Sequence, residues 1–278
     1  EDISNLMVGR EISFEYDKEE VKLGEEVLRV ENLKYVDKFK IPKLSGVSFK
    51  VSRGEIVGVA GVEGNGQSEM ISIITGNMPA IDGKVFLNGH DITRESITNI
   101  RKLGMSHVPE DRMLDGCAPE MSVQENLTVS NIDSFANKTG MIQKSKIKEF
   151  CKNQIVEFNV KTKDENQSIG SLSGGNIQKV IVAREFKANS DLLILNQPTR
   201  GVDVGAISFI HSKILEMRSD NKAILLVSAD LNELISLSDR IIVMHKGKIA
   251  GILSNVPKVT EQELGLYMLG LKKQEGLG

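Results

Sequence analysis

The sequence contains no tryptophan, and aromatic residues account for only 4% of its 278 residues. It also lacks any apolar run near the roughly 18 residues that a membrane-spanning helix needs. The opening residues, EDISNLMVGRE, have neither the basic region nor the apolar core of a signal peptide. We therefore expect a chain that does not itself cross a membrane.

Cysteine is scarce as well. Only Cys117 and Cys151 occur, far apart and without the CxxC spacing of a zinc or redox motif. The sequence therefore suggests neither a disulfide framework nor a zinc site, and a reducing cytosol fits best. The histidines share no metal-like spacing, and we expect them to be packing or surface residues. They are His90, His107, His211 and His245.

Neither sign of charge dominates the chain. A net charge of −3 and a pI of about 5.9 give no reason to expect nucleic acid as a partner. Apolar residues make up 40% and charged residues 26%, which is typical of a soluble globular protein with one large or two modest domains. The chain does not begin with Met, so we expect a fragment or a processed product.

In the first half of the chain, the sequence predicts a charged segment followed by β-strands. Residues 1–24 are polar and rich in charge, and we expect a linker or tail there. Residues 27–36 and 46–52 alternate apolar with polar residues, as half-buried strands do. EIVGVAG, at 55–61, is a continuous apolar run that predicts a buried, parallel strand.

The second half alternates strands and helices. A helix is also expected earlier, at 68–76, and further sheet at 82–92 and 104–108. Between about 121 and 168 the chain is polar and helical, with SKIKEFCKNQIVEFNV the clearest helix. The alternation that follows favours a mainly parallel α/β sheet. Its predicted strands are 191–195, 223–227, 240–245 and 248–252, and its predicted helices are 177–189, 206–218 and 231–238.

The stretch GVEGNGQSEM, Gly61 to Met70, lies between a predicted strand and a predicted helix. Such a junction can bind an anion, because glycines let successive main-chain N–H groups converge and the helix N-terminus adds a partial positive charge. The phosphate-loop pattern G-x-x-x-x-G-K-[ST] is met at Gly61, Gly66 and Ser68, but Gln67 replaces the lysine. By itself the stretch is also compatible with a purely structural turn.

A second glycine pair occurs in LSGGN, Leu172 to Asn176, directly before a predicted helix. Ser173 is placed to act as an N-terminal acceptor or donor, and the two glycines expose main-chain N–H groups. We interpret this segment as a second phosphate-binding device. The apolar LLIL and then PTRGVDVG follow it.

The order of these motifs resembles that of ATP-binding cassette proteins: phosphate loop, helical insertion, LSGG signature, acidic strand end and aspartate loop. The resemblance covers nearly the whole chain. The chain is similar to the C-terminal half of the double-cassette ATPases of ribose, simple-sugar and nucleoside importers, because MVGRE at Met7 to Glu11 resembles the linker between their cassettes. GNGQSE, SHVPEDR and LNQPTRGVDVGAISFIH are most similar to the nucleoside branch.

The resemblance implies an α/β fold of the ABC type, a P-loop NTPase domain with a mainly parallel core sheet, an antiparallel β subdomain and a helical insertion. Residues 1–24 would be the inter-cassette linker and residues 25–278 the nucleotide-binding domain, with the insertion at about 119–170. In the family two cassettes pack head to tail, and each ATP lies between the phosphate loop of one and the signature of the other.

Several positions depart from the family pattern. Gln67 stands where a lysine contacts the β- and γ-phosphates, and Asn196 where an aspartate supports Mg²⁺. Gln197 replaces the glutamate that polarises the attacking water, and Ala229 replaces the histidine at the γ-phosphate. Glu110, in PEDR, takes the place of the glutamine that links the metal to the membrane subunit. Because phosphoryl transfer depends on positioned charge, we expect this half to hydrolyse ATP weakly or not at all.

Nucleotide binding does not need all of these side chains. Main-chain N–H groups of Gly64 to Ser68 supply much of the phosphate cradle, and Ser68 can face Mg²⁺. Tyr35 is either an adenine-stacking residue or an ordinary strand aromatic. The intact LSGGN implies that this half completes the ATP site of the N-terminal cassette. The residues expected to contact ATP at either site are Tyr35, Gly61, Gly64, Asn65, Gly66, Gln67, Ser68, Glu110, Ser173, Gly174, Gly175, Asn176 and Asp203.

Two segments have competing interpretations. Glu110, Asp111 and Arg112 form either a solvated loop or part of the groove in which, in the family, a membrane subunit docks; we favour docking. Asp203 would lie at the seam between cassettes, although an aspartate before a helix is also a plain cap.

The expected function is the ATP-binding subunit of an importer for nucleosides or simple sugars, held at the cytoplasmic face of the cell membrane by permease subunits. The alternative is a regulatory or scaffold cassette without nucleotide function. A soluble translation or repair ATPase is disfavoured, because those proteins lack the MVGRE-like linker and the PEDR segment. The solute is not encoded here, since binding proteins and membrane subunits choose it.

Overall fold

The computed structural model describes residues 16, 18, 21–254 and 256–274. The chain forms two compact units. The helical unit contains Val108–Asn189 and Pro198–Lys213, and the sheet unit contains the described residues of Ser13–His107, Ser190–Gln197 and Ile214–Gly278. The MVGRE segment, on which the linker prediction rests, lies outside the described residues.

The larger sheet of the described residues has six strands in the order β10-β9-β3-β8-β7-β6. The strands β9, β3, β8 and β7 pair in parallel, and β10 joins β9 antiparallel at one edge. Every residue of β3, β7 and β8 is buried, as their apolar sequences predict. The strand bounds are β3 (Ile56–Ala60), β6 (Met105–Val108), β7 (Leu192–Asn196), β8 (Ala223–Val227), β9 (Arg240–His245) and β10 (Lys248–Leu253).

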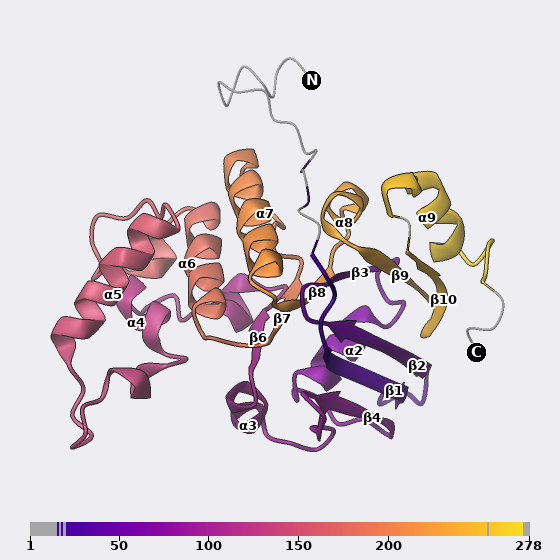
Figure 1. Cartoon of the computed structure of the whole chain (residues 1–278), viewed down its shortest axis with the longest axis horizontal. Coiled ribbons are helices and arrows are strands. Elements are labelled where there is room, and N and C mark those ends of the chain that lie inside the picture. Colours follow the sequence, from indigo (N-terminus) through magenta and orange to yellow (C-terminus); the bar gives the residue numbers. More distant parts are fainter. Residues whose placement is uncertain (1–15, 17, 19–20, 255, 275–278) are drawn as a thin grey trace, which may run out of the picture. The chain divides into compact units, whose positions relative to one another are not determined.

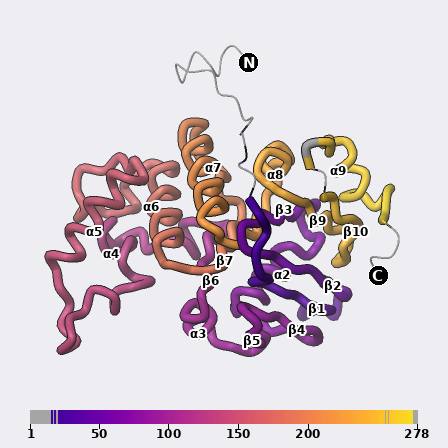
Figure 2. The backbone as a smooth tube through the Cα atoms, viewed as in Figure 1, coloured from indigo at the N-terminus to yellow at the C-terminus, as the bar shows by residue number. Residues whose placement is uncertain are grey.

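A second, four-stranded sheet has the order β2-β1-β4-β5 and is antiparallel throughout. Figure 2 labels the short β5 beside β4. The two sheets confirm the predicted α/β cassette fold with a mainly parallel core and an antiparallel β subdomain. The strand bounds are β1 (Glu26–Val36), β2 (Pro42–Ser52), β4 (Asp82–Leu87) and β5 (His90–Asp91).

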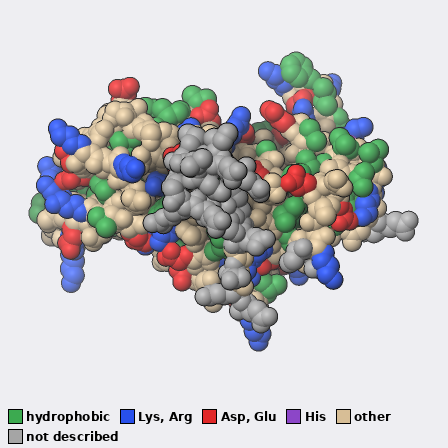
Figure 3. Space-filling view, turned by 90° about the horizontal axis from the view of Figure 1, so that it is seen from above, with side chains coloured by type: hydrophobic (Ala, Val, Ile, Leu, Met, Phe, Trp, Pro, Cys, Tyr) green, Lys and Arg blue, Asp and Glu red, His purple; other side chains and the backbone are tan. Residues whose placement is uncertain are grey.

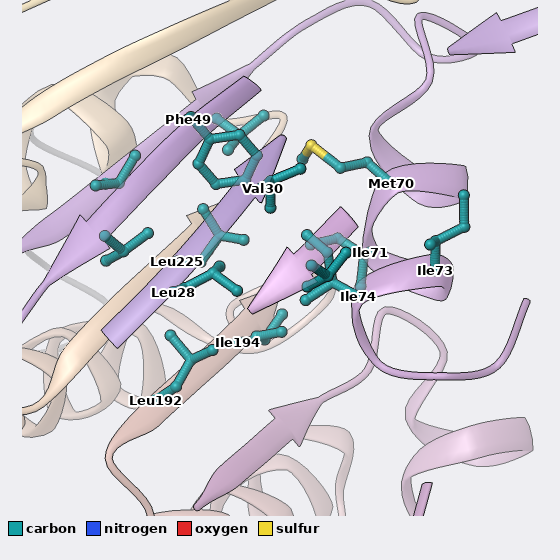
Figure 4. Close-up of a cluster of buried hydrophobic side chains, with 14 of the residues drawn as sticks. Leu28, Val30, Phe49, Met70, Ile71, Ile73, Ile74, Leu192, Ile194 and Leu225 are labelled. Carbon is teal, nitrogen blue, oxygen red and sulfur yellow. The ribbon is translucent and has the colours of Figure 1, made fainter. Parts of the chain in front are cut away.

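Helix α2 (Gln67–Ile74) joins the two sheets through one apolar cluster. Figure 4 shows Ile71 and Ile74 in the same cluster as Leu28 of β1 and Leu225 of β8. Burial of each such side chain contributes about 1.5–3 kcal/mol. This packing fixes the first turn of α2, and therefore the end of the glycine-rich loop that precedes it.

Three other short helices of the sheet unit begin at side-chain caps. The caps are Ser96, Asp230 and Thr260, each of which accepts a hydrogen bond from a main-chain N–H in the first turn. We did not predict α3 or α9 from the sequence. The bounds are α3 (Ile97–Lys102), α8 (Leu231–Leu237) and α9 (Glu261–Met268), with a 3₁₀ turn η4 (Val256–Lys258) before α9.

The helical unit is built around α4, α5 and α6, which Figure 1 shows grouped together. Ser122 and Glu125 form a reciprocal capping box at the start of α4. Ile147 and Cys151 form the buried side of α5. The bounds are η1 (Arg112–Gly116), α4 (Val123–Thr128), η2 (Ile132–Phe135), α5 (Lys144–Glu157), η3 (Ile169–Ser171) and α6 (Gly174–Phe186), followed by the start of α7 (Val204–Ser219).

The described residues of the charged N-terminal segment contact the sheet unit. Lys18 Nζ donates a hydrogen bond of 2.6 Å to the Ser238 carbonyl, and Gly24 N donates one of 3.0 Å to the Arg53 carbonyl. Burial lowers the pKa of Lys18. This part of the segment therefore packs on the unit that it precedes.

Positive and negative side chains are interspersed on the face shown in Figure 3. That mixture agrees with the small net charge of −3. Among the described residues, no helix combines the length and apolar character needed to span a bilayer.

Candidate functional site

The candidate nucleotide site lies at the carboxyl ends of three neighbouring strands. Strand β8 lies between β3 and β7, and its Val227 is opposite both Val59 of β3 and Asn196 of β7. The glycine-rich loop follows β3 directly, and Gln197 follows β7 directly. Ligands of open α/β sheets bind at this edge, beyond the carboxyl ends of the strands.

The glycine-rich loop has the backbone of an anion cradle. Gly64 and Gly66 have φ angles of +85° and +105°, which glycine adopts without strain. No atom lies within 4 Å of the position that a Cβ on Gly64 would occupy, so this part of the loop is open. Gly66 is the N-cap residue of α2 and no side chain caps that helix. The first-turn N–H groups of α2 are thus left for a ligand or for water.

Asn65 ties the loop to the turn between β9 and β10. Its Oδ1 accepts a hydrogen bond of 3.0 Å from Lys246 N, and its Nδ2 donates one of 3.3 Å to the Met244 carbonyl. Its main-chain carbonyl accepts from Gly247 N at 3.0 Å. Its own N–H donates to Val62 O, so it is already used within the loop. We predicted Asn65 as a phosphate contact and did not foresee that its side chain anchors the loop.

Gln67, at the lysine position, folds back over the loop. Its Nε2 donates a weak hydrogen bond of 3.4 Å to Val62 O. A Cβ on Gly61 would lie only 2.2 Å from the same nitrogen, so Gly61 makes room for the amide. A neutral donor therefore occupies the start of the cradle, and it brings no charge to a phosphate.

The neutral residues at the ends of β7 and β8 are bonded to each other. Gln197 has a φ of +53°, which is uncommon for a residue with a side chain. Its N–H donates to Val227 O at 2.8 Å, and its Oε1 accepts from Ala229 N at 3.0 Å. Asn196 is only 8% exposed and continues β7 as its last residue. No ionisable side chain occupies any of these positions.

The residues present suit phosphate better than they suit a metal ion. The uncapped start of α2 and the open Gly64 offer main-chain donors to a triphosphate. Ser68, predicted to face Mg²⁺, is exposed in the first turn of α2. Mg²⁺ prefers carboxylate oxygens and phosphates. Within the described residues no group of three His, Cys, Asp or Glu could hold a metal ion.

Tyr35 is half-buried in β1, opposite Leu44 of β2, and packs against the apolar cluster on one side. This packing accounts for the residue as a strand aromatic, the simpler of its two interpretations. Part of Tyr35 is exposed, and stacking of this part on adenine remains a proposal.

The signature segment LSGGN enters its helix earlier than the sequence predicts. Helix α6 begins at Gly174, so Gly174, Gly175 and Asn176 form its first turn instead of preceding it. Ser173 is the N-cap residue, but its hydroxyl makes no capping hydrogen bond. It accepts instead from Asn176 Nδ2 at 2.8 Å, and Ser173 is exposed. The first-turn N–H groups of α6 therefore have no side-chain cap.

Both signature glycines allow close approach by other side chains of the helical unit. A Cβ on Gly174 would lie 2.9 Å from Nη2 of Arg112, and a Cβ on Gly175 would lie 2.7 Å from Oδ2 of Asp203. The other oxygen of Asp203 accepts from Ala206 N at 3.0 Å, so this residue caps the first turn of α7. Asp203 thus caps α7, as predicted, and also lies beside the signature glycine Gly175.

Glu110, predicted at the position linking metal and membrane subunit, forms an ion pair with Arg200. Asp111 caps η1 by accepting from Met113 N and Leu114 N, and these hydrogen bonds lower the pKa of its carboxyl. The PEDR segment is therefore a structured connection within the helical unit and not only a solvated loop.

Three of the four histidines have environments that the structure defines clearly. His90 Nδ1 lies 3.1 Å from Asn88 O and is exposed, and His245 Nδ1 lies 2.8 Å from Met268 O. His211 is buried, at 2% exposure. These environments agree with the predicted packing and surface roles.

Comparison with solved structures identifies the class of domain. A crystal structure of a nucleotide-free ATP-binding cassette from an ABC transporter is similar to this chain, with a TM-score of 0.67 and 26% identity. The similarity covers 82% of this chain and 91% of that one. The fold and the two glycine motifs together define an ATP-binding cassette.

A protein-family model described as ABC transporter matches residues 44–200, more than half of the 278 residues. The chain therefore belongs to the ABC transporter family.

Two curated relatives are similar over almost all of this chain. One is the nucleoside import ATP-binding protein NupA of Lactococcus lactis subsp. cremoris (strain MG1363), 42% identical over 97% of this chain and 53% of that protein. The other is the guanosine import ATP-binding protein NupO of Bacillus subtilis (strain 168), 41% identical over 99% of this chain and 54% of that protein. The chain thus spans about half the length of the curated relatives it matches.

Proposed function

We propose that this chain is the C-terminal ATP-binding half of a double-cassette importer ATPase, and that its signature completes the ATP site of the N-terminal cassette. The proposal is supported by similarity to about half of two proteins named for nucleoside and guanosine import. A nucleoside is the favoured solute class and a simple sugar the second. Permease subunits would hold the protein at the cytoplasmic face of the membrane.

The observation that carries the proposal is the contrast between the two glycine motifs. The signature is intact, and the first turn of α6 has an exposed Ser173 without a side-chain cap. At the other motif neutral side chains stand at Gln67, Asn196, Gln197 and Ala229. Loss of one well-placed donor can cost about 10²-fold or more in rate. The chain's own site therefore binds ATP and Mg²⁺ weakly and does not turn over.

When bound, ATP supplies the phosphoryl group, and the residues of this chain only hold it. Main-chain N–H groups from Gly66 to Ser68 would hold the phosphates, and the exposed Ser68 hydroxyl would be available to Mg²⁺. At the signature, Ser173 and the first-turn N–H groups of α6 would offer hydrogen-bond donors to a nucleotide held by the partner cassette.

A regulatory cassette without nucleotide function is the alternative, and the Gln67 amide lying over Gly61 favours it. Calorimetry with ATP and Mg²⁺ tests binding by the isolated chain. Ser173→Arg in the double-cassette protein tests the signature, with Ser145→Arg at an exposed position of α5 as control. We expect weak binding, and loss of turnover for Ser173→Arg only. Unchanged turnover in that variant would favour the regulatory cassette.

A further inference from the structure

The side chain of Arg112 holds two consecutive main-chain carbonyls of the aspartate loop. Its Nη1 donates a hydrogen bond of 2.6 Å to Arg200 O, and its Nη2 donates one of 3.2 Å to Gly201 O. Both donors belong to one planar guanidinium, so the two carbonyls are fixed relative to each other. Arg112 itself begins η1, which Asp111 caps.

The same guanidinium lies against the first glycine of the signature. A Cβ on Gly174 would be 2.9 Å from Nη2 and 3.5 Å from Gly201 O. A side chain at position 174 would therefore displace the Arg112 guanidinium from its place beside the start of α6. Further along α6, the buried Gln178 donates through Nε2 to Pro198 O at 2.8 Å. The loop is thus held at its beginning by α6 and in its middle by Arg112.

The PEDR segment holds residue 200 in two ways. Glu110 forms an ion pair with the Arg200 side chain, whereas Arg112 takes its main-chain carbonyl. The ion pair is exposed, with side-chain exposures of 65% for Arg200 and 36% for Glu110, and such pairs contribute little to stability. Arg112 restrains two consecutive main-chain carbonyls of the loop, whereas the ion pair restrains only the Arg200 side chain.

We infer that Arg112 is a positioning residue for the signature: it fixes the aspartate loop against Gly174, so that the first turn of α6 keeps the orientation in which it faces a nucleotide phosphate. This inference rests on the proposed role of the signature in completing the partner cassette's site. Lysine does not replace Arg112, because one ammonium on a flexible stem does not hold two carbonyls in a fixed fork. Through Arg112, the PEDR segment thus has a role within the cassette that is separate from docking.

The first test measures main-chain amide hydrogen exchange of the 278-residue chain. We expect Arg112→Ala and Arg112→Lys to speed exchange at residues 174–177 and 199–203. Arg200→Ala is the matched control, because it removes a cation from the same loop and keeps the carbonyl that Arg112 binds. Unchanged exchange in both Arg112 variants, or equal acceleration in the control, would overturn the inference.

The second test measures ATP turnover of the double-cassette protein. A misplaced group can cost about 10²-fold in rate, so we expect kcat to fall about tenfold to a hundredfold in Arg112→Ala and Arg112→Lys. The KM for ATP and the thermal midpoint should change little, and Arg200→Ala should lose far less. Full rescue by lysine, or a lower thermal midpoint that accounts for the whole loss, would overturn the inference.

The two tests separate this inference from the proposed function. If Ser173→Arg also retains turnover, the proposed function fails, and with it the role of Arg112 in presenting the signature. If Ser173→Arg abolishes turnover while both Arg112 variants retain it, the proposed function stands and the inference alone fails. If Arg112→Ala does not fold, Arg112→Lys, which keeps the charge, decides both measurements.

Discussion

Ala229 N donates a hydrogen bond of 3.0 Å to Oε1 of Gln197, so the ends of β7 and β8 are joined by neutral groups. In the family pattern a glutamate and a histidine stand at these two positions. The bond holds the Gln197 side chain toward β8 while its own N–H donates to Val227 O.

Restoring charge at the glycine-rich loop should tighten nucleotide binding. Opposite unit charges 4 Å apart attract by about 1 kcal/mol in water and about 4 kcal/mol near a protein surface. We therefore expect the triple change Gln67→Lys, Asn196→Asp and Gln197→Glu to lower the Kd for ATP with Mg²⁺ by about tenfold or more, measured by calorimetry.

The single variant Gln197→Glu is the control for this experiment. Its carboxylate can still accept from Ala229 N, so the local hydrogen bond survives while one charge is added. We expect little change in the Kd. A triple variant that binds no more tightly than this control would contradict the assignment of the site.

Asn65 should stabilise the loop through the turn between β9 and β10. Asn65→Ala removes the hydrogen bonds to Lys246 N and Met244 O, which we expect to cost about 1–3 kcal/mol in the free energy of unfolding. Urea denaturation measures this loss, and calorimetry measures the accompanying loss of ATP affinity. Asn65→Asp keeps the acceptor for Lys246 N and adds a negative charge. We therefore expect Asn65→Asp to weaken the binding free energy for ATP more than it lowers the free energy of unfolding. A larger loss of unfolding free energy would argue against the role of Asn65 in anchoring the loop.

Asp191 should make stability depend on pH at the acid end. A hydrogen bond of 2.7 Å from Arg53 lowers the pKa of its carboxyl, with a further hydrogen bond from Asn88. Because the pKa is lower in the folded state, this stabilisation is complete above the unfolded pKa of about 3.9 and is lost as the pH falls through the folded pKa.

We expect Asp191→Asn to unfold more easily than the unmodified chain at pH 7, by about 1 kcal/mol or less, because both partners are one-third exposed. The difference should shrink as the pH falls below about 4. Urea denaturation between pH 7 and pH 3 measures it. Arg53→Gln should remove the same increment, and a constant difference at all pH values would refute the assignment.

Cys151 should report on unfolding of the helical unit. It is fully buried in α5, and burial raises the pKa of its thiol to about 12. The reactive thiolate is therefore scarce at pH 8. In a Cys117→Ser background, iodoacetamide followed by mass spectrometry should detect labelling only when denaturant is added. Rapid labelling of the folded chain would show that α5 opens readily.

Much of the fold could be predicted from the sequence because burial has a local signature. The continuous apolar runs at β3, β7 and β8 correspond to strands buried along their whole length. Weak local signals account for the omissions. Helix α3 has six residues and buries only Ile100, and α9 contains Gly265, which lowers helix propensity.

The boundary of α6 shows a different limit. Two glycines in LSGGN favoured a loop, and we expected the helix to start at Ile177. The structure begins it at Gly174, and the two glycines leave room for the Arg112 and Asp203 side chains beside the first turn. Packing therefore overrides the low helix propensity of glycine at this position.

The sequence by itself determined which chemical groups are available: two glycine-rich motifs, GVEGNGQSEM and LSGGN, and neutral residues at Gln67, Asn196, Gln197 and Ala229. Only the tertiary structure decided what those groups touch. Asn65 forms hydrogen bonds with Met244 and Lys246, which lie 179 and 181 positions further along the chain. Arg112 forms them with the carbonyls of Arg200 and Gly201, 88 and 89 positions further along. Local spacing encodes the period of a helix or strand, but it does not encode which distant segment folding brings to a given side chain.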